Sequence, residues 1–270
     1  MGKELNRLRK RKKIIKQLDC IFENANTSLV IHYSCESFYE KTDGKTPRIT
    51  SIAVRNLESG QTDSFSIHQV AEEHHIEFSD ITNKYDSLER EMLNRYFEFL
   101  NTHQHCNWIH WNMRDVNYGF QAIEHRYRAL GGTPIQLNED KKFDLSRAII
   151  SLYGVSYIGH PRLPNLLEKN NITHKDFLTG EEEAKAFDNK DFVKLHRSTL
   201  RKVDTLANII ERTYNQKLKT NSTWLEQHGY SFTVLLEIIK SHPFFTFLTI
   251  LIVILALIEK SFNVFNLLGK

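Results

Sequence analysis

Cysteine and proline are both scarce in this sequence, with three cysteines and five prolines among 270 residues. The number of cysteines is odd and their spacing matches no metal-binding knuckle. A disulfide framework is therefore not indicated, and a reducing compartment is favoured. The first residues are charged where the apolar part of a signal peptide would lie, so we expect no secretory signal. The sequence also contains no P-loop, dinucleotide-binding fingerprint or Ser-His-Asp signature.

Charge of one sign is not in large excess, because the net charge is only +3. That value does not by itself indicate a nucleic-acid partner. The basic residues are concentrated at the start, where eight of the first sixteen residues are Lys or Arg. We expect residues 1–27 to form a basic amphipathic head that contacts an anionic lipid surface or nucleic acid. The contacting residues would be Arg9, Lys10, Arg11, Lys12 and Lys13. The alternative is a solvated helix that packs on the rest of the protein.

One long run without charge lies near the end of the chain, at Ser241–Ile258. As a helix, Pro243–Ile258 would rise about 24 Å at ~1.5 Å per residue, against a hydrocarbon thickness of about 30 Å. The segment is short but sufficient if Lys240 and Lys260 extend toward the two surfaces. We therefore expect a transmembrane helix at residues 241–260 and a short tail at 261–270. This tail anchor would be single-pass, with the soluble domain in the cytoplasm. A buried core helix or an oligomerisation helix is the alternative.

The remaining sequence is typical of an α/β domain at residues 28–215, followed by a linker and approach helix at 216–240. Short apolar runs indicate strands at Leu29–His32, Ile49–Asn56, Thr62–His68 and Asn107–Trp111. Apolar residues at spacings of three and four indicate helices. The predicted helices are Lys84–Thr102, Val116–Leu130, Leu145–Tyr153, Leu163–Asn170 and Phe192–Tyr214.

Several segments of this domain have the order and spacing of a known set of motifs. The first and second strands lie at VIHYSCESF and RITSIAV, and a second motif at IHWNMRDVNYGFQAIEHRYRALGG. Later helices lie at KFDLSRAI and RLPNLLEKNNI, and a last motif falls in LHRSTLRKVDTLANII. Together these segments resemble the DEDD 3′-5′ exonuclease superfamily, which implies a ribonuclease H-like mixed sheet flanked by helices.

The resemblance implies hydrolysis of phosphodiesters by two Mg²⁺ or Mn²⁺ ions held by four carboxylates. Glu36 occupies the position of the family's first-motif glutamate, and Asp204 that of the last aspartate. Ser34 replaces the aspartate that normally bridges both ions. Asn117 replaces the aspartate of the second motif, with Asp115 two residues earlier.

His196 would correspond to the residue that activates water, although it lies eight residues before Asp204 where five is usual. The implied catalytic set is thus Glu36, Asp204 and His196, and the implied metal ligands are Glu36, Asp115 and Asp204. Ser and neutral Asn do not compensate two divalent cations, so the sequence favours a catalytically degenerate domain.

We therefore expect a membrane-tethered, exonuclease-like domain that binds nucleic acid, a nucleotide or a protein partner at the cytoplasmic face. One alternative is an active nuclease with a rearranged metal site that also uses Asp144. The other is a membrane effector whose tail oligomerises or perturbs the bilayer.

Overall fold

The computed structural model describes residues 3–36, 46–115, 117–173, 175–223 and 226–227, with positions 247 and 250. The expected approach helix, transmembrane helix and short tail thus lie almost wholly outside the described residues. Within the part of the chain that is described, no helix has the length and apolar character needed to cross a bilayer.

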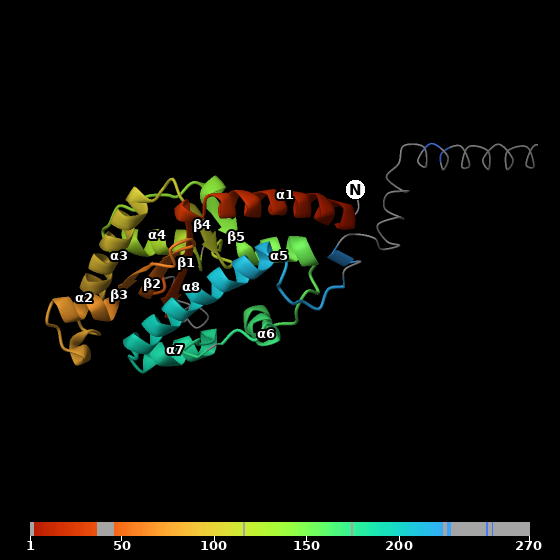
Figure 1. Cartoon of the computed structure of the whole chain (residues 1–270). Helices are drawn as coiled ribbons and strands as arrows, with labels where there is room; N and C mark the ends of the chain where they lie inside the picture. The colour runs from red at the N-terminus through yellow and green to blue at the C-terminus, as the bar shows by residue number, and fades with distance from the viewer. Residues whose placement is uncertain are drawn as a thin grey trace, which may run out of the picture.

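The centre of the protein is a five-stranded mixed sheet (Figure 1). Its strand order is β3-β2-β1-β4-β5, in which β2 is antiparallel to β1 and β3. β1, β4 and β5 are parallel to one another. The strands are β1 Ser28–Cys35, β2 Ile49–Asn56, β3 Thr62–Ser66, β4 Asn107–His110 and β5 Lys142–Asp144. The α/β class with a mixed sheet is confirmed.

Eight helices are described around this sheet, and both faces are covered (Figure 1). They are α1 Lys3–Glu23, α2 Ile67–Glu73, α3 Tyr85–Thr102, α4 Phe120–Ala129, α5 Leu145–Tyr153, α6 Arg162–Lys169, α7 Gly180–Asp188 and α8 Phe192–Tyr214. The predicted bounds of α5 and α8 are confirmed, and those of α3 and α6 differ by one residue at one or both ends.

Three predicted elements have the wrong bounds, and β4 ends one residue earlier than predicted. β1 runs from Ser28 to Cys35, not from Leu29 to His32. The third strand ends at Ser66, and α2 begins at Ile67. Ser66 keeps an extended backbone conformation, and its hydroxyl donates to Gln69 Oε1 at 2.7 Å. α4 begins at Phe120, not Val116. The preceding residues form a turn in which Gly119 has φ 153° and bridges to Arg114. A helix cannot extend backward through such a backbone conformation.

Strand alternation on β1 separates two apolar cores. Leu29, Ile31 and Tyr33 belong to the core that includes α3 and α4. Val30 belongs to the core formed with α1, α5 and α8. Further along the second face, His32 and Ser34 replace the apolar residues, and both are buried. The polar end of β1 therefore lies under α8.

α1 packs against α5 and α8 through its apolar side. Leu18 and Ile21 are buried, and the ring of Phe22 stacks on Tyr214 of α8 with centroids 4.0 Å apart. The expected helix at the basic head is thus present. Its apolar face is used in packing on the domain, as the alternative interpretation requires.

Candidate functional site

The carboxyl ends of the parallel strands β1, β4 and β5 meet at one edge of the sheet. In open α/β sheets, ligands bind outside such an edge. Glu36 follows β1, Asp144 ends β5, and the turn that contains Asp115 follows β4. Two of the predicted acidic residues, together with Asp144, therefore lie on the side of the sheet where the resemblance places a site.

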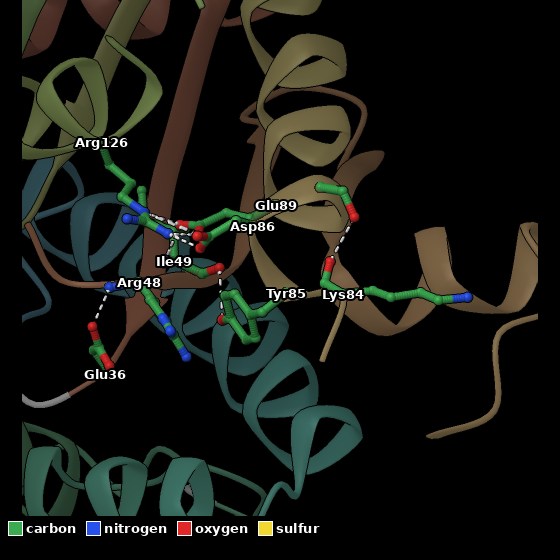
Figure 2. A network of polar contacts seen from close by, with 9 residues as sticks. Glu36, Arg48, Ile49, Lys84, Tyr85, Asp86, Glu89 and Arg126 are labelled. Carbon is green, nitrogen blue, oxygen red and sulfur yellow. Dashed lines mark hydrogen bonds and ion pairs between the residues drawn. The ribbon is translucent and has the colours of Figure 1, made fainter. Parts of the chain in front are cut away.

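Glu36 is buried and engaged with the beginning of β2 (Figure 2). Its Oε1 accepts a hydrogen bond from the Arg48 backbone N–H at 2.7 Å, and its own N–H donates to the Arg48 carbonyl at 2.9 Å. These bonds extend the β1–β2 pairing by one residue beyond the strands. The carboxylate thus has a local structural role in joining the two strands.

Asp144 is also buried, and two arginines neutralise it. Its Oδ1 caps α5 by accepting from the Arg147 N–H at 3.3 Å. Its Oδ2 lies 3.2 Å from Arg114 Nε and 3.6 Å from Arg147 Nε. An acid paired in this way offers little negative charge to a cation.

Asp204 lies toward the opposite end of β1. Its carboxylate pairs with Arg55 Nη1 at 3.0 Å, and Arg55 is in register with Val30 near the start of β1. Glu36 instead follows Cys35, which is in register with Ile49. Val30 and Cys35 are separated by about 17 Å along the strand. The structure therefore does not bring Asp204 to the edge where Glu36 lies.

The surroundings of Asp204 form an open cleft of about 540 Å³ beside the turn at Glu58–Gly60. Arg55, Tyr214 and Glu211 also line this cleft. Asp204 remains 44% exposed in its pair with Arg55, so it is a partly solvated acid on the helix.

The other two predicted residues also stand apart from a metal site. His196 is buried on α8 with its ring 5.0 Å from that of His68 on α2. Burial lowers the pKa of His196 to about 4, with a smaller effect from His68. Asp115 is exposed and accepts from the Asn117 N–H at 2.8 Å within its own turn. Among residues 3–36, 46–115, 117–173 and 175–223, no three His, Cys, Asp or Glu side chains are placed to hold a metal ion.

A group of polar side chains under α8 was not predicted. Lys202 Nζ pairs with Glu183 Oε1 of α7 at 2.8 Å, and the Ser198 hydroxyl donates to the same oxygen at 3.0 Å. The Lys202 and Glu183 side chains are only 7% and 12% exposed. We call His32, Ser34, Glu183, Ser198 and Lys202 the polar cluster.

The polar cluster includes the polar end of β1. Ser34 is in register with Ser51, whose hydroxyl lies 2.7 Å from that of Thr199, one turn before Lys202 on α8. Burial lowers the pKa of His32, and the nearby Lys202 ammonium lowers it further. An ammonium thus lies where the resemblance would require carboxylates around divalent cations.

The network in Figure 2 continues from Arg48 toward α3 and α4. The Ile49 N–H donates to Glu89 Oε1 at 2.6 Å, and Arg126 Nε lies 3.0 Å from both Glu89 oxygens. Burial raises the pKa of Glu89 to about 7, against the opposing effect of Arg126. These residues fix the beginning of β2, so their role is structural.

The polar cluster could not be predicted from local sequence patterns. Glu183 is one of three acidic residues in the first turn of α7, where acids commonly favour the helix dipole. Lys202 is one of several basic residues on an amphipathic helix. Their pairing depends on how α7 and α8 cross, which no local spacing encodes.

Comparisons of this chain with protein-family models, with curated proteins and with solved structures found no match.

Proposed function

We propose that this chain is a ribonuclease H-like domain that binds single-stranded nucleic acid without hydrolysing it. The order β3-β2-β1-β4-β5, with β2 alone reversed, is the arrangement that the resemblance to the DEDD exonucleases leads one to expect. A fold by itself does not define a function. The proposal therefore depends on the edge of the sheet.

The buried Lys202–Glu183 pair is the main observation in favour of a domain that does not hydrolyse nucleic acid. Two-metal hydrolysis needs several carboxylates around the ions. Here Ser34 and a lysine ammonium share the polar end of β1. Lys202 neutralises Glu183 at 2.8 Å, so the acid held nearby offers little negative charge to a divalent cation.

Arginines around the same edge of the sheet support the proposal that the domain binds nucleic acid. The Arg48 backbone bonds to Glu36, while its guanidinium lies 5.0 Å from the centre of the Tyr85 ring. Arg114 and Arg147 both reach Asp144. The Arg147 side chain is 67% exposed and that of Arg114 is 38% exposed. Arginine binds phosphate oxygens with two N–H donors. Near this edge Tyr118 stacks on the buried Tyr33, with centroids 4.7 Å apart.

The proposal also places the domain at a membrane, anchored by residues 241–260 with the domain in the cytoplasm. Its support is the sequence, since Ser241–Ile258 contains no Asp, Glu, Lys or Arg. The expected Mg²⁺ or Mn²⁺ cofactor belongs only to the alternative of an active enzyme.

The test uses the full chain in detergent micelles with labelled single-stranded DNA and RNA, with and without Mg²⁺ or Mn²⁺. We expect binding without cleavage. The variant pair Arg48→Gln and Arg147→Gln weakens binding and lowers the salt slope by about 0.7 for each phosphate that is no longer neutralised. Arg114 is kept because it is the nearer of the two arginines that pair with Asp144. A matched control changes Lys190 and Lys194, which are exposed beside the start of α8.

Two outcomes overturn the proposal. Cleavage that disappears in Glu36→Ala and Asp204→Ala would establish the alternative of a nuclease with a rearranged site. Absence of binding to either nucleic acid would leave the alternative of a membrane effector with an oligomerising tail.

A further inference from the structure

The exposed basic residues of α1 lie on one face of the helix. Arg9, Lys12, Lys13 and Lys16 follow the spacing of three and four residues that marks a single helical stripe, and Lys10 flanks it. All five are exposed. We call them the basic stripe. It extends about 10 Å along the helix, at ~1.5 Å per residue.

The opposite face of α1 is occupied by packing. Leu18 and Ile21 are buried against α5 and α8, and Ile14 and Ile15 pack beside them. Arg11 turns partly toward this side, and burial lowers its pKa. Among α1 residues 6–23, whose side chains the structure describes, no apolar face is left to insert into a bilayer. Any contact that the basic stripe makes is electrostatic, with the helix resting on a charged surface.

One contact joins the start of α1 to the segment that follows α8. The Arg7 guanidinium donates to the backbone carbonyl of Glu226. Glu226 also belongs to a capping arrangement, since its N–H donates to Thr223 Oγ1 at 3.3 Å and its Oε2 accepts from the Thr223 N–H at 2.8 Å. The start of α1 thus lies beside the point from which the chain continues toward the uncharged run at Ser241–Ile258.

We propose that the basic stripe binds the headgroups of anionic phospholipids at the surface of the membrane that holds the C-terminal anchor. This inference rests on the tether in the proposed function. A basic residue near an anionic leaflet contributes about 1 kcal/mol, which corresponds to roughly a fivefold change in occupancy. Nucleic acid offers similar charges, but the contact between Arg7 and Glu226 places the start of α1, the helix that carries the stripe, beside the chain that leads to the anchor.

Cys20 provides a natural reporter for this contact. It is exposed one turn after Lys16 on α1 and points to the same side as the basic stripe at 3.6 residues per turn. Cys35 and Cys106 are buried, and burial raises the pKa of both thiols. Since the thiolate is the reactive form, an uncharged maleimide reagent reacts first at Cys20.

The experiment reconstitutes the full chain in vesicles of phosphatidylcholine, with and without phosphatidylserine as about a third of the lipid. We expect Cys20 modification to be several-fold slower in the anionic vesicles, and the difference to shrink at high salt. The variant Lys12→Gln, Lys13→Gln, Lys16→Gln removes the difference while preserving helix propensity. The control Lys190→Gln, Lys194→Gln, Arg197→Gln removes the same charge from exposed positions near the start of α8 and keeps the difference.

Flotation with the vesicles separates this inference from the proposed tether. Flotation with both lipid mixtures, but equal Cys20 reactivity in both, overturns the lipid contact and leaves the tether standing. Flotation only with anionic vesicles, abolished in the Lys12, Lys13, Lys16 variant, supports the lipid contact without the tether. Absence of flotation with either overturns both. If the same variant loses oligonucleotide binding and the rate of Cys20 modification does not depend on lipid charge, the basic stripe binds nucleic acid and not lipid.

Discussion

The buried pair of Glu89 and Arg126 makes a strong prediction about stability. Glu89 is fully buried, and Arg126 lies within 3.0 Å of both of its oxygens. Replacing Arg126 by Met leaves a buried carboxylate without its ionic partner. Breaking a buried pair in this way costs about 3–5 kcal/mol. For a domain of this size that loss lowers the melting temperature by about 10 °C.

The contribution of Glu89 to stability depends on pH, and its direction follows from the pKa of the carboxyl group. Burial raises the pKa of Glu89 from 4.5 to about 7 in the folded chain. The folded state therefore holds this proton more tightly than the unfolded chain does. The stabilisation that comes from protonated Glu89 is fully present below about pH 4.5 and is lost as the pH rises through about 7. The change amounts to roughly 3 kcal/mol, at 1.36 kcal/mol per pKa unit. Removing Arg126 raises the pKa of Glu89 further.

We therefore expect Arg126→Met to be far less stable than the native chain at pH 8 and closer to it at pH 5. The double variant Glu89→Gln, Arg126→Met replaces the buried charge by a neutral amide that still accepts from the Ile49 N–H. It should recover about 2 kcal/mol of the loss at pH 8. Thermal unfolding of the full chain in detergent, followed by near-ultraviolet circular dichroism, compares both variants with the native chain. An equal cost at both pH values, or no recovery in the double variant, would refute this reasoning.

Three further predictions concern other buried residues. Gly119→Ala should lower stability by more than about 1 kcal/mol, because its Cβ would lie 2.5 Å from the Met113 carbonyl at a φ of 153°; an unchanged melting temperature would contradict this. Burial lowers the pKa of His110 from 6.5 to about 3, so its stabilisation is present above about pH 6.5 and is lost as the pH falls toward 3. His110→Gln should flatten acid unfolding over that range, as measured by fluorescence. Lys202→Met should cost about 2–3 kcal/mol by leaving Glu183 without its cation, whereas Lys202→Arg should retain most of the stability in thermal unfolding.

Local patterns in the sequence were sufficient for the longer elements. The apolar spacing in α3 and α8 predicted both helices closely, since each has one continuous buried face. The three residues of β5 are too few to show strand alternation, and this strand was not predicted. α2 was also missed, because it is short and its first residues continue a strand-like run.

The candidate site could be predicted less well from the sequence than the longer helices and strands. Glu36 and Asp204 fitted motif spacing, but α8 runs opposite to β1, so residues further along the helix lie nearer the start of the strand. Thr199 is beside Ser51, while Asp204 reaches Arg55. A shift of a few positions on this helix moves a side chain from one end of the sheet toward the other. Motif spacing alone does not detect such a shift.

α8 also determines how far the polar cluster lies from the N-terminal helix. The helix rises about 18 Å between Lys202, which pairs with Glu183, and Tyr214, which stacks on Phe22 of α1. At that separation none of the described side chains of α1 reaches the polar cluster directly. A molecule held at the sheet edge and a surface held by α1 would not compete, so both can be occupied at once.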